Sequence, residues 1–108
     1  MKLYRQGDVL IRQVKVLPNN ATPVDNKKLG RIVLAYGEVT GHAHAIALDE
    51  AVEYTMERAG EAVRRFLSVL TGASVKHEEH ATIPLPPGVY EIVQQREYTP
   101  EAIRNVAD

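Results

Sequence analysis

Along much of the chain, apolar and polar residues alternate with a period of two. This pattern predicts β-strands. Residues 8–17 and 89–98 show it best and are rich in β-branched side chains. Residues 31–36, RIVLAY, form a short apolar run typical of a buried strand, and residues 39–48, VTGHAHAIAL, alternate again. Proline, glycine and asparagine dominate residues 18–30 and mark a loop. We therefore expect an all-β fold, a small barrel or sandwich.

Residues 49–70 allow two interpretations. Val52, Met56, Val63 and Phe66 fit one helical stripe, although Gly60 would cost such a helix about 1 kcal/mol relative to alanine. Alternatively, residues 52–56 form a strand, the chain turns near Gly60, and residues 63–70 return as a second strand. An α+β fold with a helix at about 50–70 is thus the alternative to the all-β fold. At the end of the chain, Thr99 and Pro100 predict a short helix over residues 100–108.

Composition narrows the class of protein. The 108 residues suit one domain, 1–108, and the formal charge of -1 shows no electrostatic footprint for nucleic acid or an anionic membrane. The chain has no cysteine, which excludes disulfides and thiolate metal sites. Neither a signal peptide nor a membrane-spanning apolar stretch is visible, so we expect a cytoplasmic protein. Exposed strand edges make a homodimer plausible.

All four histidines fall into two close pairs, His42 with His44 and His77 with His80. Side chains two residues apart on a strand share a face, so His42 and His44 can bind one ion. Residues three apart, such as His77 and His80, share one side of a turn. Imidazole is the commonest metal ligand near neutral pH. We therefore expect a divalent transition metal, zinc first, with manganese, iron or nickel as alternatives.

Nearby polar residues extend this candidate site. Glu38, Glu78 and Glu79 are the carboxylates closest in sequence, each a potential ligand, orienting partner or general base. On the last strand, Gln94, Arg96 and Tyr98 would share a face and are candidates for binding substrate. The HEEH segment is not the zincin motif, whose histidines are four residues apart. The pair Arg64-Arg65 is expected on the solvated surface.

Two resemblances bear on these residues. His42 and His44 resemble the HxH pair of cupins, with Asp49 at the usual position of the following acid and Glu50 one residue beyond it. In the second cupin motif a Pro-x-Gly precedes the third histidine, whereas here Pro87-Gly88 follows His80. This resemblance is confined to residues 42–50. It implies only a metal ion bound inside a β-barrel.

A broader resemblance spans most of the chain and rests on four segments: GDVL at 7–10, GEVTGHAH at 37–44, HEEH at 77–80 with LPPGVY at 85–90, and QREY at 95–98. Together they resemble an uncharacterised family of small bacterial and phage-type proteins. In that family the stretch before HEEH looks like a strand, which favours the hairpin at residues 50–70. The resemblance implies no activity.

Three functions are compatible with the sequence. The first is a metal-dependent hydrolase acting on a small molecule such as a phosphoester or nucleotide, with an acidic residue as base. The second is a non-catalytic module in which four imidazoles bind a structural metal. The third is a metal-independent nuclease that uses a histidine pair as acid and base.

Overall fold

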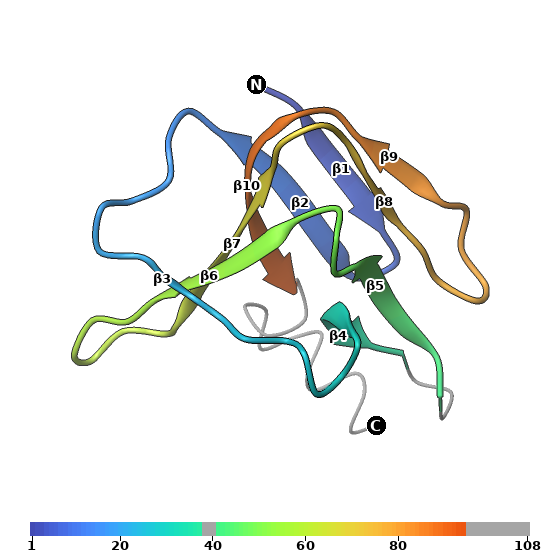
Figure 1. Cartoon of the computed structure of the whole chain (residues 1–108), viewed down its shortest axis with the longest axis horizontal. Coiled ribbons are helices and arrows are strands. Elements are labelled where there is room, and N and C mark those ends of the chain that lie inside the picture. The colour runs from blue at the N-terminus through green and yellow to red at the C-terminus, as the bar shows by residue number, and fades with distance from the viewer. Residues whose placement is uncertain (38–40, 95–108) are drawn as a thin grey trace, which may run out of the picture.

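The computed structural model describes residues 1–37 and 41–94, and every regular element there is a β-strand (Figure 1). The strands are β1 (Leu3–Gln6), β2 (Val9–Val14), β3 (Thr22–Pro23), β4 (Arg31–Tyr36), β5 (Ala43–Ala47), β6 (Val52–Met56), β7 (Arg64–Val69), β8 (Ala73–Val75), β9 (Ile83–Leu85) and β10 (Gly88–Gln94). The all-β prediction is confirmed, whereas the predicted helix at residues 100–108 lies outside the described residues. Within these residues no helix is long and apolar enough to cross a membrane.

A six-stranded antiparallel sheet, in the order β1-β2-β10-β7-β6-β3, forms the larger layer. Two smaller antiparallel pairs, β4-β5 and β8-β9, are joined by an isolated bridge between Ala45 and Lys76. One hydrophobic cluster contains side chains from all three sheets, among them Ile11 and Tyr90 of the large sheet, Ile46 of β5 and Val75 of β8. The two small pairs therefore cover one face of the large sheet.

Alternation along the strands determines which residues reach this core. On β2, Val9 and Ile11 are fully buried, while Leu10 and Arg12 point to the opposite face. Ile92 of β10 lies directly across from Ile11 and continues the buried face. Because strand side chains repeat every two residues, each central strand contributes one apolar row to the core.

Residues 50–70 form a hairpin, so the helical alternative is wrong. β6 pairs with β7 from Val52↔Ser68 to Met56↔Arg64, and Gly60 in the connection has a φ of 80°. This left-handed conformation suits glycine, which has no Cβ to clash. The far side of β7 pairs with β10, so hydrogen bonds on both edges fix the segment as a strand. Tertiary pairing here overrides the helical stripe.

Arg65 is not the solvated surface residue that its sequence context indicated. Its guanidinium donates to the carbonyl oxygens of Val33 (2.7 Å) and Leu34 (2.6 Å) and to the carboxylate of Glu53 (2.8 Å). The two carbonyls belong to the part of β4 where the register with β5 shifts, between Val33 and Ala35. Arg65 thus bonds the large sheet to the β4-β5 pair.

Candidate metal centre

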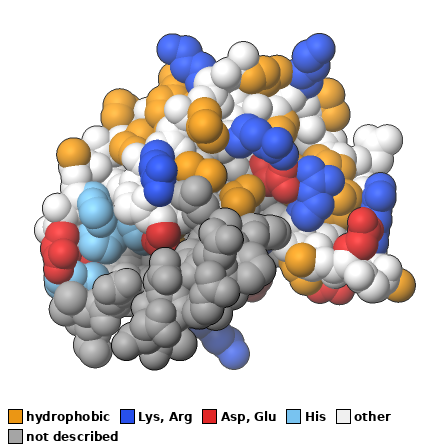
Figure 2. Space-filling model, turned by 180° about the vertical axis from the view of Figure 1, so that it is seen from behind, with side chains coloured by type: hydrophobic (Ala, Val, Ile, Leu, Met, Phe, Trp, Pro, Cys, Tyr) orange, Lys and Arg blue, Asp and Glu red, His pale blue; other side chains and the backbone are white. Residues whose placement is uncertain are grey.

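The four imidazole rings converge, with His77 in the middle. Its ring centroid lies 4.3 Å from that of His44, 4.7 Å from that of His80 and 5.8 Å from that of His42. The centroids of His44 and His80 are 5.8 Å apart. Figure 2 shows the histidine side chains gathered at one end of the molecule, next to acidic side chains. The two sequence pairs thus lie in one cluster, as the spacing predicts.

The register of one bridge accounts for this convergence. The backbones of Ala45 and Lys76 exchange two hydrogen bonds, of 3.0 and 2.9 Å. Continuing this antiparallel register places residue 44 opposite 77, 43 opposite 78, and 42 opposite 79. The contacts follow that order: rings of His44 and His77 meet, and Glu78 Oε1 accepts the Ala43 backbone N–H at 2.9 Å.

Among the residues that the structure describes, His42, His77 and Glu78 bring three potential ligand atoms together. One donor atom from each lies within 4.8 Å of the other two. Hydrogen bonding to the backbone, first of all to the Ala43 N–H, holds the pKa of Glu78 below its usual range, and His42 and His77 lower it further. Its carboxylate is therefore ionised at neutral pH, the state in which it binds metal.

His42 has a buried polar atom without a hydrogen bond. Its Nδ1 lies 3.0 Å from Glu79 Oε1, which is ion-pair distance, but the alignment is not that of a hydrogen bond. Within the described part of the chain, no side-chain nitrogen or oxygen other than this Nδ1 is buried and unsatisfied. Since an unsatisfied buried nitrogen costs free energy, the atom suits a ligand that the protein chain does not provide.

His44 is oriented by Gln6, which sequence reasoning did not select. His44 Nδ1 lies 2.8 Å from Gln6 Oε1, and both side chains are buried. The Gln6 amide nitrogen donates to the carbonyl oxygens of Val75 (3.0 Å) and Ala81 (2.9 Å). Burial, followed by the charge of His77, lowers the pKa of His44, so this ring is neutral at pH 7.

The His77 ring is oriented by a backbone N–H, whereas the His44 ring is oriented by the Gln6 side chain. His77 Nδ1 accepts the backbone N–H of Glu79 at 3.0 Å. In the neutral ring the proton is then on Nε2. An ion that binds Nε2 therefore requires the proton to move to Nδ1 and the Glu79 N–H to turn away.

Two glycines permit the rings to lie this close to the backbone. A Cβ atom on Gly7 would meet His80 Nε2 at 3.1 Å and His44 Cε1 at 3.2 Å. One on Gly37 would meet His77 Nε2 at 3.0 Å. Gly7 belongs to the two-residue turn between β1 and β2, with a φ of 60°. Larger residues at either position would push against the imidazoles.

The same turn brings Asp8 to the cluster. Asp8 Oδ1 lies 3.8 Å from His44 Nε2, and Gln94 donates a 3.1 Å hydrogen bond to Asp8 Oδ2. Gln94, a predicted substrate residue, thus reaches the rim of the cluster through Asp8. Arg96, Tyr98 and Glu38 lie outside the described residues.

Gln6, Gly7 and Asp8 were missed as site residues because nothing in their local pattern marks them as partners of a distant histidine pair. For Gly7 and Asp8 the available signal was the segment GDVL at 7–10, one of the four segments on which the family resemblance rests; Gln6 lies outside it.

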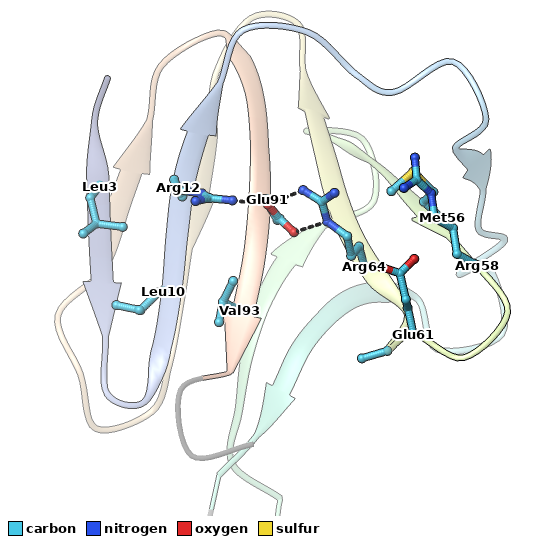
Figure 3. A pocket seen from close by; sticks show the side chains of 10 residues that line it. Leu3, Leu10, Arg12, Met56, Arg58, Glu61, Arg64, Glu91 and Val93 are labelled. Carbon is cyan, nitrogen blue, oxygen red and sulfur yellow. Dashed lines mark hydrogen bonds and ion pairs between the residues drawn. The ribbon is translucent and has the colours of Figure 1, made fainter. Parts of the chain in front are cut away.

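A hollow lies on the face of the large sheet that points away from the core (Figure 3). It measures about 590 Å³, and both apolar and charged side chains line it, with the Glu91 carboxylate among them. Arg12 and Arg64 converge on Glu91 from the neighbouring strands, and Arg64 also lies over the ring of Phe66 at 5.3 Å. The hydrogen bond from Arg64, and then that from Arg12, hold the pKa of Glu91 below its usual range against the effect of burial.

Comparison with known proteins identifies a family of unknown function. No curated protein and no solved structure matches the chain. A family sequence model, described as a domain of unknown function, matches residues 5–95, a range that includes all four histidines. The chain belongs to this family, domain of unknown function DUF8820.

Proposed function

We propose that this protein binds a divalent transition metal ion at the histidine cluster, with His42, His77 and Glu78 as ligands. The observation that carries the proposal is the approach of three donor atoms, from two distant segments, to within 4.8 Å of one another. The unsatisfied Nδ1 of His42 and the ionised carboxylate of Glu78 support it.

Two imidazoles and one carboxylate suit several metals. The same donor set occurs in catalytic zinc sites and in non-haem iron sites. Zinc is our first choice, and manganese, iron and nickel are alternatives that the same donors accept. Without thiolates, the affinity depends on imidazole and carboxylate alone.

Three protein ligands leave coordination positions open. This favours a catalytic site over a closed structural site of four imidazoles. Metal-dependent hydrolysis, with the ion activating a water molecule, is therefore the activity to test first, and phosphoesters or nucleotides are the first substrates. Glu79, whose Oε1 lies 3.0 Å from His42 Nδ1, is an additional carboxylate placed to act as base.

The test is metal content after purification, measured by elemental analysis together with affinity by chelator competition. We expect about one equivalent of metal in the unsubstituted protein. We expect a large loss of affinity in a His42→Ala, His77→Ala double variant. Cobalt substitution adds a second readout, since its visible absorption reports the coordination number.

Glu78→Gln and Glu61→Gln form a matched pair. Both remove one charge from an exposed glutamate, but Glu61 lines the hollow on the other face of the sheet. Only Glu78→Gln should weaken metal binding. Equal metal content in the unsubstituted protein and in the double histidine variant would contradict the proposal.

A further inference from the structure

One side of β5 carries a row of small side chains. Ala43, Ala45 and Ala47 alternate with His44 and Ile46 and so lie on the opposite face of the strand. Ala43 and Ala45 are buried there and Ala47 is exposed. With methyl groups only, this row leaves room above the strand. A hollow of about 310 Å³ lies there.

Two cationic side chains border this row from opposite sides. Arg31 of β4 pairs with Ala47, and Lys76 pairs with Ala45. Directly opposite residues in an antiparallel pair have side chains on the same face, so both cations lie on the alanine side. Both line the hollow.

Among the residues that the structure describes, no neighbour neutralises either cation. Across residues 1–37 and 41–94, the side chains of Arg31 and Lys76 make no hydrogen bond or ion pair. By contrast, Arg12, Arg64 and Arg65 are all paired with buried glutamates. Within the described part of the chain, both Arg31 and Lys76 can therefore bind an anion from solution.

The hollow opens onto the candidate metal ligands. His77 and Glu78 belong to its lining, directly after Lys76 in the chain. An anion between Arg31 and Lys76 would thus lie beside two of the three residues proposed to hold the ion.

We infer that this hollow binds the phosphate group of an anionic substrate and presents the rest of that substrate to the metal. Phosphate binding stands by itself, and only the presentation of the substrate to the metal rests on the proposed function. A phosphate dianion matches the charge of these two cations, and the planar guanidinium of Arg31 can donate two parallel hydrogen bonds to a pair of phosphate oxygens. The three alanines provide the space.

The test uses the full chain loaded with zinc and inorganic phosphate as the probe, followed by calorimetry and by ³¹P line broadening. An Arg31→Gln, Lys76→Gln double variant should bind phosphate at least about tenfold more weakly, because two charge-assisted contacts are lost. Its zinc content should be unchanged. Arg58→Gln, in the hollow on the other face, is the matched control and should leave phosphate affinity unaltered.

The outcomes separate the two proposals. Equal phosphate affinity in the double variant and the unsubstituted protein, or no phosphate binding by zinc-loaded protein, overturns the inference and leaves the metal site standing. If the unsubstituted protein holds no metal, the proposed function fails. The same titration on metal-free protein then still decides whether Arg31 and Lys76 bind phosphate.

Discussion

Gln6 determines which nitrogen of His44 carries the proton. The Gln6 amide nitrogen faces two backbone carbonyls, those of Val75 and Ala81, so its oxygen must face His44 Nδ1. An oxygen acceptor requires a proton on that nitrogen, which leaves the lone pair on Nε2. Metal-binding histidines commonly donate their second ring nitrogen in this way. His44 is thus prepared to present Nε2 to the cluster.

A Gln6→Leu substitution should abolish the preference of His44 for the Nδ1–H tautomer. We expect ¹⁵N chemical shifts of the His44 ring to change from a single Nδ1–H form to a mixture. Stability should fall by about 1–3 kcal/mol, because the buried Val75 carbonyl and the partly buried Ala81 carbonyl lose their donor. Gln6→Glu is the control, since a carboxylate still accepts from Nδ1 but cannot donate to the carbonyls. It should lower stability and keep the tautomer; a mixed tautomer in this variant would contradict the argument.

Arg65→Met should be one of the more damaging substitutions outside the cluster. It leaves the buried Glu53 carboxylate without its cation and two β4 carbonyls without a donor, which we expect to cost about 2–4 kcal/mol in urea unfolding. A Glu53→Leu change added to Arg65→Met should recover part of the loss, because no buried charge then remains unpaired. Strictly additive losses would show that the two residues act independently.

The contacts of Arg65 could not be predicted from the sequence. A short apolar run predicts a strand at residues 31–36, and alternation predicts one at 89–98 and predicts that His42 and His44 share a face. Neither pattern shows that β7 lies beside β10, or that Arg65 then points toward β4. Such facts depend on strand order, which no local pattern encodes.

The same limit applies to the candidate site. Two close histidine pairs in a chain without cysteine are a sequence-level signal, and so is Glu78 next to His77. Gln6 was invisible because a buried glutamine gains meaning only when it is placed opposite a particular ring. The short strands β1, β3, β8 and β9 were missed for a related reason, since few residues give too little alternation to detect.

Because of Glu91, we expect the folded protein to lose stability in acid. The hydrogen bond from Arg64, and then that from Arg12, lower the folded-state pKa of Glu91. Its contribution is therefore complete above the ordinary glutamate pKa of about 4.3 and is lost as pH falls through the lower folded value. Urea unfolding of Glu91→Gln should show a flatter decline over this acidic range. At neutral pH the variant should lose about 1 kcal/mol, because both arginines are roughly half exposed and screened by solvent. An unchanged acid profile would contradict this role.

Gly7 and Gly30 separate backbone strain from crowding of the histidines. Both have positive φ, 60° and 72°, so alanine at either position should cost about 1–2 kcal/mol. A Cβ on Gly30 meets nothing within 4 Å, whereas one on Gly7 meets His80 Nε2 at 3.1 Å and His44 Cε1 at 3.2 Å. Thermal unfolding should thus show similar losses in both variants. Chelator competition should show weaker metal binding in Gly7→Ala alone, because the displaced His44 and His80 rings would press on the proposed ligand His77, whose ring centroid lies 4.3 and 4.7 Å from theirs. If Gly30→Ala weakened metal binding as much, general destabilisation would explain the effect, and the close packing of Gly7 against the imidazoles would have no part in it.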